Sequence, residues 1–74
     1  MEKEITMRLN EECKDSTVLG WKTLTIVDFG YDARGDVQTA IIISGGREPM
    51  LFNITEPEIT EDLMINYSVV KVEL

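Results

Sequence analysis

Apolar and polar side chains alternate near the start of the chain: Ile5, Met7 and Leu9 with Glu4, Thr6 and Arg8. A period of two is typical of a strand that has one face on the core and the other in water. The pattern therefore predicts a strand over residues 4–9. Residues 10–19 are polar and turn-like and end at a glycine, which predicts a loop.

Three further segments are rich in β-branched and aromatic residues and predict a meander of strands. They cover residues 21–29, 37–43 and 48–54. The turn-forming sequence GYDARGD separates the first two segments, and SGGR separates the last two. Glycine-rich connections of this length are typical of β-hairpins.

The register of the last two of these strands follows from their apolar positions. The favoured register joins Ile41 with Met50, Thr39 with Phe52, and Val37 with Ile54. It gives both strands one apolar face, which a slip of one residue would break. Pro49 lacks an N–H group, so we expect a four-residue loop in this register, with Pro49 directed outward.

Two registers remain open between the segments 21–29 and 37–43. In the first, Leu24 and Ile26 face the core, opposite Ile41 and Thr39, and an apolar outer face carries Trp21, Val27, Phe29, Ala40, Ile42 and Leu51. In the second, Trp21, Val27 and Phe29 turn inward while Leu24 and Ile26 are exposed. Either register leaves more apolar surface than a bare monomer normally shows, so we expect a helix, a closing strand or a partner to cover it.

A short helix is predicted over residues 56–65. Its signals are a capping-box spacing between Thr55 and Glu58, Pro57 in the first turn, and Ile59 and Leu63 one turn apart. A competing interpretation begins at Thr60 and makes a single tight turn through Leu63 and Met64. In both cases Asn66 ends the segment.

Residues 67–74 predict the last strand, with Val70, Val72 and Leu74 on one side and Tyr67, Val69, Lys71 and Glu73 on the other. We therefore expect a single domain over residues 1–74. It is mainly β, either a small five-stranded antiparallel sheet with the helix packed across one face or a partly open barrel with one short helix or helical turn before the last strand.

The predicted layout resembles that of SH3-like barrels. The peptide-binding signature of that family, an Ala-Leu-Tyr-Asp-Tyr-like run and a paired Trp-Trp, is absent from this sequence. The resemblance therefore implies an architecture and no groove for a proline-rich helix.

The chain has 74 residues with 14 acidic and 7 basic side chains, a formal charge of −7, no histidine and one cysteine. Without histidine, catalytic triads and histidine zinc sites are excluded. Cys13 has no partner for an intramolecular disulfide, which favours a reducing cytoplasm, and we expect no leader and no membrane span. The basic residues are dispersed along an acidic chain, which disfavours direct nucleic-acid binding. We expect no enzyme, no metal and no cofactor.

Two sets of side chains are candidates for binding a partner. The aromatic anchors are Trp21, Phe29 and Tyr31, and the steering charges are Glu56, Glu58, Glu61 and Asp62. We expect a non-catalytic module that binds to the surface of another protein. That protein is either a partner with a basic surface or a second copy of the chain itself. The alternative is an acidic inhibitor that imitates a nucleic acid and blocks a nucleic-acid-binding protein, of the kind mobile elements encode. Asp28, Asp32 and Asp36 are interpreted as turn residues rather than calcium ligands.

Overall fold

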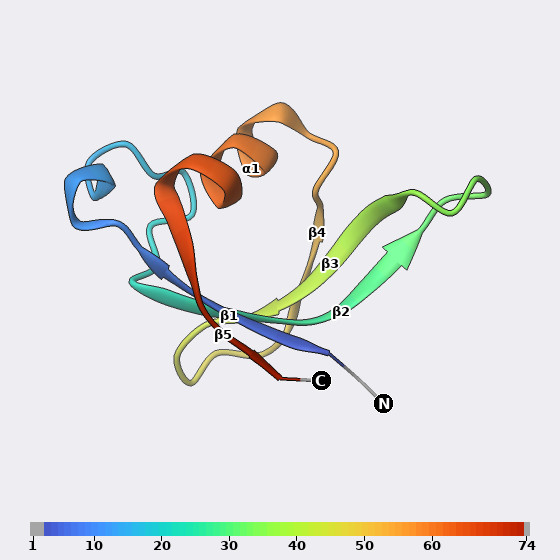
Figure 1. The fold of residues 1–74 in the computed structure, drawn as a ribbon, viewed down its shortest axis with the longest axis horizontal. Coiled ribbons are helices and arrows are strands. Elements are labelled where there is room, and N and C mark those ends of the chain that lie inside the picture. The colour runs from blue at the N-terminus through green and yellow to red at the C-terminus, as the bar shows by residue number, and fades with distance from the viewer. Residues whose placement is uncertain (1–2, 74) are drawn as a thin grey trace.

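The computed structural model describes residues 3–73 (Figure 1). The elements in chain order are β1 (Glu4–Leu9), the 3₁₀ turn η1 (Glu11–Cys13), β2 (Thr23–Tyr31), β3 (Val37–Ile43), β4 (Met50–Asn53), α1 (Pro57–Glu61), the π-helical turn η2 (Asp62–Asn66) and β5 (Tyr67–Glu73). The predicted strand over 67–74 is confirmed through Glu73, and Leu74 lies outside the described residues.

The five strands form one antiparallel sheet in the order β4-β3-β2-β1-β5. The sheet curls around its core face, and α1 with η2 lies over that face between the first loop and β4 (Figure 1). No ladder joins β4 to β5 among the described residues, so the barrel is partly open. The prediction of a mainly β fold with a short helix before the last strand is confirmed.

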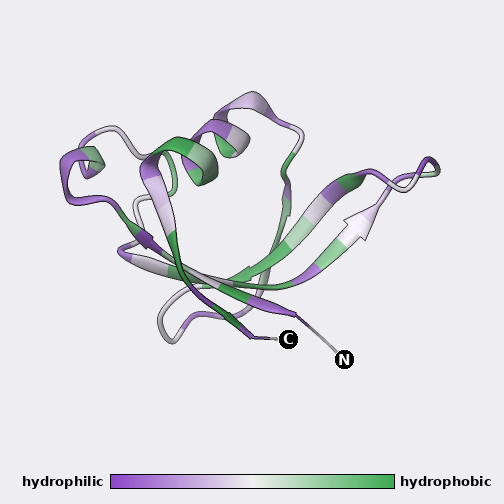
Figure 2. Ribbon diagram, viewed as in Figure 1, coloured by the Kyte–Doolittle hydropathy of each residue, from purple (hydrophilic) through white to green (hydrophobic). Residues whose placement is uncertain are grey.

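The core lies between the curled sheet and the helical segment. Its buried apolar side chains are Met7, Leu24, Ile26, Ala40, Ile42, Leu63 and Tyr67. Figure 2 shows hydrophobic residues along the middles of the strands and in the last helical turn, and a hydrophilic first loop. Burial of these side chains is the main favourable contribution to folding for a chain of this size.

Both predicted registers between β2 and β3 are wrong, because they placed Ile26 opposite Thr39 or Ala40, and β2 also contains a bulge at Val27. Ile26 pairs with Ile42, but Asp28 pairs with Ile41, so β2 holds one extra residue. The extra residue reverses the alternation of faces along the strand. Leu24 and Ile26 therefore face the core as the first register proposed, and Phe29 also turns inward, beside Ala40.

The predicted register between β3 and β4 is wrong by one residue. Ala40 pairs with Phe52 and Ile42 pairs with Met50, so the core face of β3 carries Ala40 and Ile42 rather than Thr39 and Ile41. The shift is possible because both faces of β3 are apolar, and the pairing of Ile42 with Ile26 turns Ala40 and Ile42 inward. Leu51 is consequently left on the outer face.

Val70 forms a second bulge, in β5, and overturns the predicted faces of this strand. Met7 pairs with Val69 while Ile5 pairs with Val72, so one residue of β5 between these pairs is unmatched. Val69 and Val72 therefore lie on the same side of the sheet, and Lys71 lies on the outer side opposite Thr6. The adjacent valines Val69 and Val70 mark the break in alternation.

The predicted helix is confirmed as a helical segment from Pro57 to Asn66, and the single tight turn from Thr60 is wrong. Pro57 occupies the first turn as expected. The capping box is wrong, because the residue before the helix is Glu56 and no side chain caps it. Thr55 instead donates its N–H to Asn53 Oδ1 at 3.1 Å, an interaction that completes a turn before the helix.

The observed β2–β3 register can be tested at Gly30, which pairs with Thr39. A Cβ at position 30 would overlap Thr39 Oγ1. We expect Gly30→Ala to lower the free energy of unfolding by about 1–2 kcal/mol, and Gly30→Ala with Thr39→Ala to recover most of the loss in urea denaturation. Equal destabilisation in both backgrounds would contradict the register.

Candidate functional site

The terminal strand β5 carries three exposed valines, more exposed apolar residues than any other described strand. Val69, Val70 and Val72 expose 55%, 50% and 52% of their surface. β5 is the terminal strand in the sheet order, and its second edge pairs with no described strand. Unpaired backbone groups on such an edge can form a ladder with another extended chain. The edge of β5 is therefore a candidate docking site.

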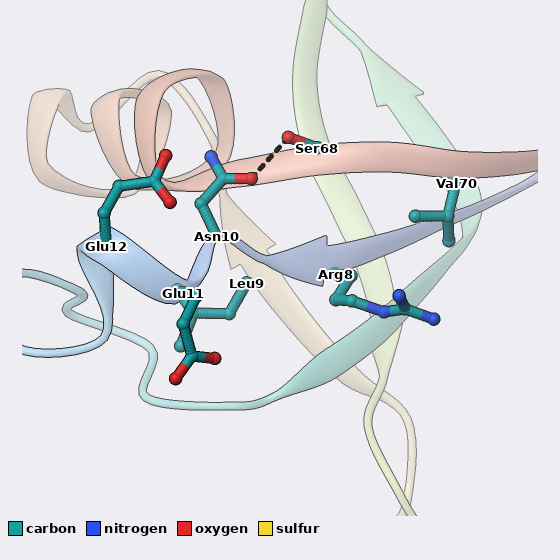
Figure 3. A pocket seen from close by; sticks show the side chains of 7 residues that line it. All are labelled: Arg8, Leu9, Asn10, Glu11, Glu12, Ser68 and Val70. Atoms are coloured by element: carbon teal, nitrogen blue, oxygen red, sulfur yellow. Dashed lines mark hydrogen bonds between the residues drawn. The ribbon is translucent and has the colours of Figure 1, made fainter.

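A shallow hollow of about 420 Å³ lies beside this edge, where β1 ends (Figure 3). It is lined by Arg8, Leu9, Asn10, Glu11, Glu12, Ser68 and Val70. The side chain of Asn10 makes two hydrogen bonds in the wall of the hollow. Ser68 Oγ donates to Asn10 Oδ1 at 2.5 Å, and Asn10 Nδ2 donates to the carbonyl of Ile65 at 3.2 Å. The floor of the hollow is thus held by bonds among β1, β5 and η2.

A second hollow of about 220 Å³ adjoins the first and shares its wall from Arg8 to Glu11. Its other lining residues are Lys14 and Lys22. Neither these lysines nor Arg8 makes an ion pair or side-chain hydrogen bond with the rest of residues 3–73. The basic residues that are dispersed in the sequence are therefore partly gathered by the fold.

The three predicted aromatic anchors do not form one exposed surface. Trp21 and Phe29 are half-buried and pack against the core. The ring of Trp21 meets that of Phe52 edge-on, with centroids 5.7 Å apart. Tyr31 alone is freely exposed, at 61%, and it lies at the end of β2 in the hairpin that extends away from the core (Figure 1).

Of the four predicted steering charges, Glu56, Glu58 and Glu61 are exposed around α1. Asp62 exposes only 1% of its surface, so its assignment to the acidic surface is wrong. Its Oδ2 accepts hydrogen bonds from Leu19 N at 2.8 Å and Thr17 Oγ1 at 2.9 Å, and its Oδ1 accepts one from Asn66 Nδ2 at 2.7 Å. Asp62 therefore ties the first loop to the helical segment.

Two titratable groups are perturbed where the first loop meets the helix. Burial opposes ionisation of Asp62, but the hydrogen bonds from Asn66, Leu19 and its other donors outweigh burial and hold the pKa of Asp62 below its ordinary 3.8. Burial raises the pKa of Tyr67, whose hydroxyl donates to the carbonyl of Trp21 at 2.5 Å. Both groups are structural, and neither lies in the two hollows.

Of the three aspartates predicted to form the second turn, Asp28 lies within β2, where its Oδ1 accepts a hydrogen bond from Phe29 N, and Asp32 acts on the backbone of the turn. Asp32 Oδ1 accepts hydrogen bonds from the N–H groups of Arg34 and Asp36, which confirms its role as a turn residue. Across residues 3–73, no three His, Cys, Asp or Glu side chains come together in a way that could hold a metal ion. Cys13 is a free thiol, half-buried in η1.

No family model, curated protein or solved structure matches this chain. Within the described residues, no helix combines the length and the apolar character needed to cross a membrane.

The buried Asp62 carboxylate predicts a specific pH dependence. Its folded pKa is depressed, so its contribution to stability is present above the unfolded pKa, 3.8, and is lost as the pH falls through the folded value. We expect Asp62→Asn to cost about 2–3 kcal/mol at pH 7, and the difference from the unmodified chain to shrink below about pH 4 in urea titrations. Glu61→Gln is the exposed control, with a cost under about 0.5 kcal/mol. A difference that stays constant down to pH 2 would contradict this role.

The packing of Trp21 predicts a loss of stability rather than of binding alone. We expect Trp21→Ala to lower the free energy of unfolding by about 2–4 kcal/mol, because its ring covers Phe52 and the core edge. Tyr31→Ala, at an exposed position, should cost under about 0.5 kcal/mol. Thermal and urea denaturation of both variants measures this contrast, and equal costs would show that Trp21 is not a core residue.

Proposed function

We propose that the protein is a small non-catalytic binding module that occupies a surface of a partner protein through the open edge of β5. The observation that carries the proposal is the row of half-exposed valines on a terminal strand whose second edge pairs with no strand among residues 3–73. An extended segment of the partner would add to the sheet as a further strand beyond β5. Its backbone would supply the ladder, and the valines would supply apolar contact.

Two features of β5 limit indiscriminate pairing. The bulge at Val70 interrupts the regular ladder, and Lys71 places a charge on the edge, where it pairs with Glu73 at 2.6 Å. Bulges and edge lysines are common protections against aggregation. A partner strand must accommodate both, which supports a specific partner rather than self-assembly into sheets. With a lone free cysteine, we place this activity in the cytoplasm.

Quantitative affinity capture from the native host, followed by measurement of Kd with the purified partner, tests the proposal. We expect Val70→Asp to weaken binding by at least about tenfold, because a charge would have to be desolvated at the new ladder. Leu51→Asp is the matched control: it changes an apolar residue of 70% exposure on the opposite edge strand, β4, and should leave binding within about twofold.

Two results would overturn the proposal. One is a partner whose affinity is unchanged by Val70→Asp. The other is loss of binding on charge reversal at Glu58 and Glu61 together with indifference to Val70→Asp, which would favour the acidic mimic. A substitution of Trp21 would not distinguish these two modes of binding, because Trp21 packs on the core and its loss would destabilise the fold.

The same variants separate a foreign partner from a second copy. Light scattering coupled to size-exclusion chromatography over a concentration series measures the oligomeric state. A dimer that Val70→Asp dissociates and Leu51→Asp preserves would identify the chain itself as the occupant of the β5 edge.

A further inference from the structure

Three of the seven basic residues of this acidic chain line one hollow. Arg8 comes from β1, Lys14 follows η1, and Lys22 immediately precedes β2. The hydrogen bond from Leu9 N to the carbonyl of Lys22, 2.9 Å long, holds the first and last of these segments side by side. The convergence is produced by the fold, because up to fourteen positions of sequence separate the three side chains.

The charge of this hollow is opposite to that of the chain. Its lining contains the three cations and one carboxylate, Glu11, which gives a formal charge of +2 against −7 for the whole protein. The side chains of Arg8 and Glu11 point in different directions in Figure 3, and no ion pair joins them. None of the three cations makes an ion pair with another side chain among residues 3–73.

We propose that this hollow, lined by Arg8, Lys14 and Lys22, binds a small dianion, of which the phosphoryl group of a phosphate monoester is the best match. A phosphate monoester carries close to two negative charges at pH 7 and offers three acceptor oxygens. A guanidinium with two ammonium groups supplies donors of the kind that recognise such oxygens. The volume of about 220 Å³ leaves room for part of the group that carries the phosphate.

The backbone segments around the hollow are held in place by hydrogen bonds, which favours binding of this ligand. The adjoining wall is held by Asn10, whose backbone N–H donates to the carbonyl of Asn66 at 2.8 Å and whose side chain bridges β5 and η2. Lys14 follows η1 directly, and the first loop as a whole is tied to Asp62 through Thr17 and Leu19. The backbone that carries the cations is therefore positioned before a ligand arrives, which reduces the entropic cost of binding.

Titration of the amide NMR spectrum tests the proposal on the protein alone. The probes are glycerol phosphate, succinate and acetate at equal ionic strength. We expect saturable shifts at Leu9, Asn10, Lys14 and Lys22 with both dianions, and binding at least about tenfold weaker for acetate. Tighter binding of glycerol phosphate than succinate would assign the phosphoryl group, and the reverse order would assign a dicarboxylate.

Two variants with the same change of charge, and a change of pH, test whether the affinity depends on Arg8 and on the charge of the ligand. Arg8→Gln should weaken glycerol phosphate by at least about tenfold, because it removes a charge-assisted pair of hydrogen bonds. Arg34→Gln makes the same charge change in the distant β2–β3 turn and should alter the affinity by less than about twofold. Lowering the pH below about 6 protonates the monoester and should weaken its binding while the cations stay charged.

Three outcomes would overturn the proposal: shifts that do not saturate, acetate binding as tightly as the dianions, or equal effects of Arg8→Gln and Arg34→Gln. The titration contains no partner protein, so its result is independent of whether a strand adds to β5.

Discussion

The buried carboxylate of Asp62 connects the two parts of the chain that the sheet itself does not join. It accepts hydrogen bonds from Thr17 and Leu19 of the first loop and from Asn66 at the end of the helical segment. A long polar loop has little apolar surface of its own to bury, so a buried charge with its donors fully supplied replaces hydrophobic packing at this contact. With the loop held in this position, Leu19 and Trp21 pack against the core, and the hydroxyl of Tyr67 donates a hydrogen bond to the carbonyl of Trp21.

The bulges in the ladders decide which side chains the core receives. Each adds one residue to one strand and so reverses the alternation of faces beyond it. The bulge at Val27 turns Phe29 inward, and the bulge at Val70 places Lys71 outside while Val69 and Val72 share the other face. The valines of β5 are exposed because only the first residue of the strand, Tyr67, is buried against the core. Exposure there results from the fold rather than from a lack of apolar residues elsewhere.

Local patterns predicted the elements but not the pairings between them. The strands and the helix were visible from alternation, β-branched content and Pro57, since these depend on neighbours in sequence. The registers required knowing where alternation breaks. Adjacent apolar pairs mark both bulges, Ile26-Val27 and Val69-Val70, but Ile41-Ile42 is such a pair without a bulge, so the pairs alone do not locate the breaks. Asp62 was misplaced for a similar reason: it stands among exposed glutamates, and only Thr17 and Leu19, distant in sequence, distinguish it. The meeting of Arg8 with Lys14 and Lys22 was likewise invisible, because it depends on the path of the first loop.

The two proposed surfaces share the end of β1 and its neighbour β5, where Ser68 and Val70 line the larger hollow and Arg8 borders both. An acidic chain repels anions at long range, so a hollow of net positive charge would attract an anion only once the anion has come within about a Debye length, roughly 10 Å. Net charge would then select against polyanions such as nucleic acid, while the hollow retains small dianions. Because one proposed contact is apolar and the other is a short-range electrostatic one, both proposed surfaces would fit side by side on one small domain.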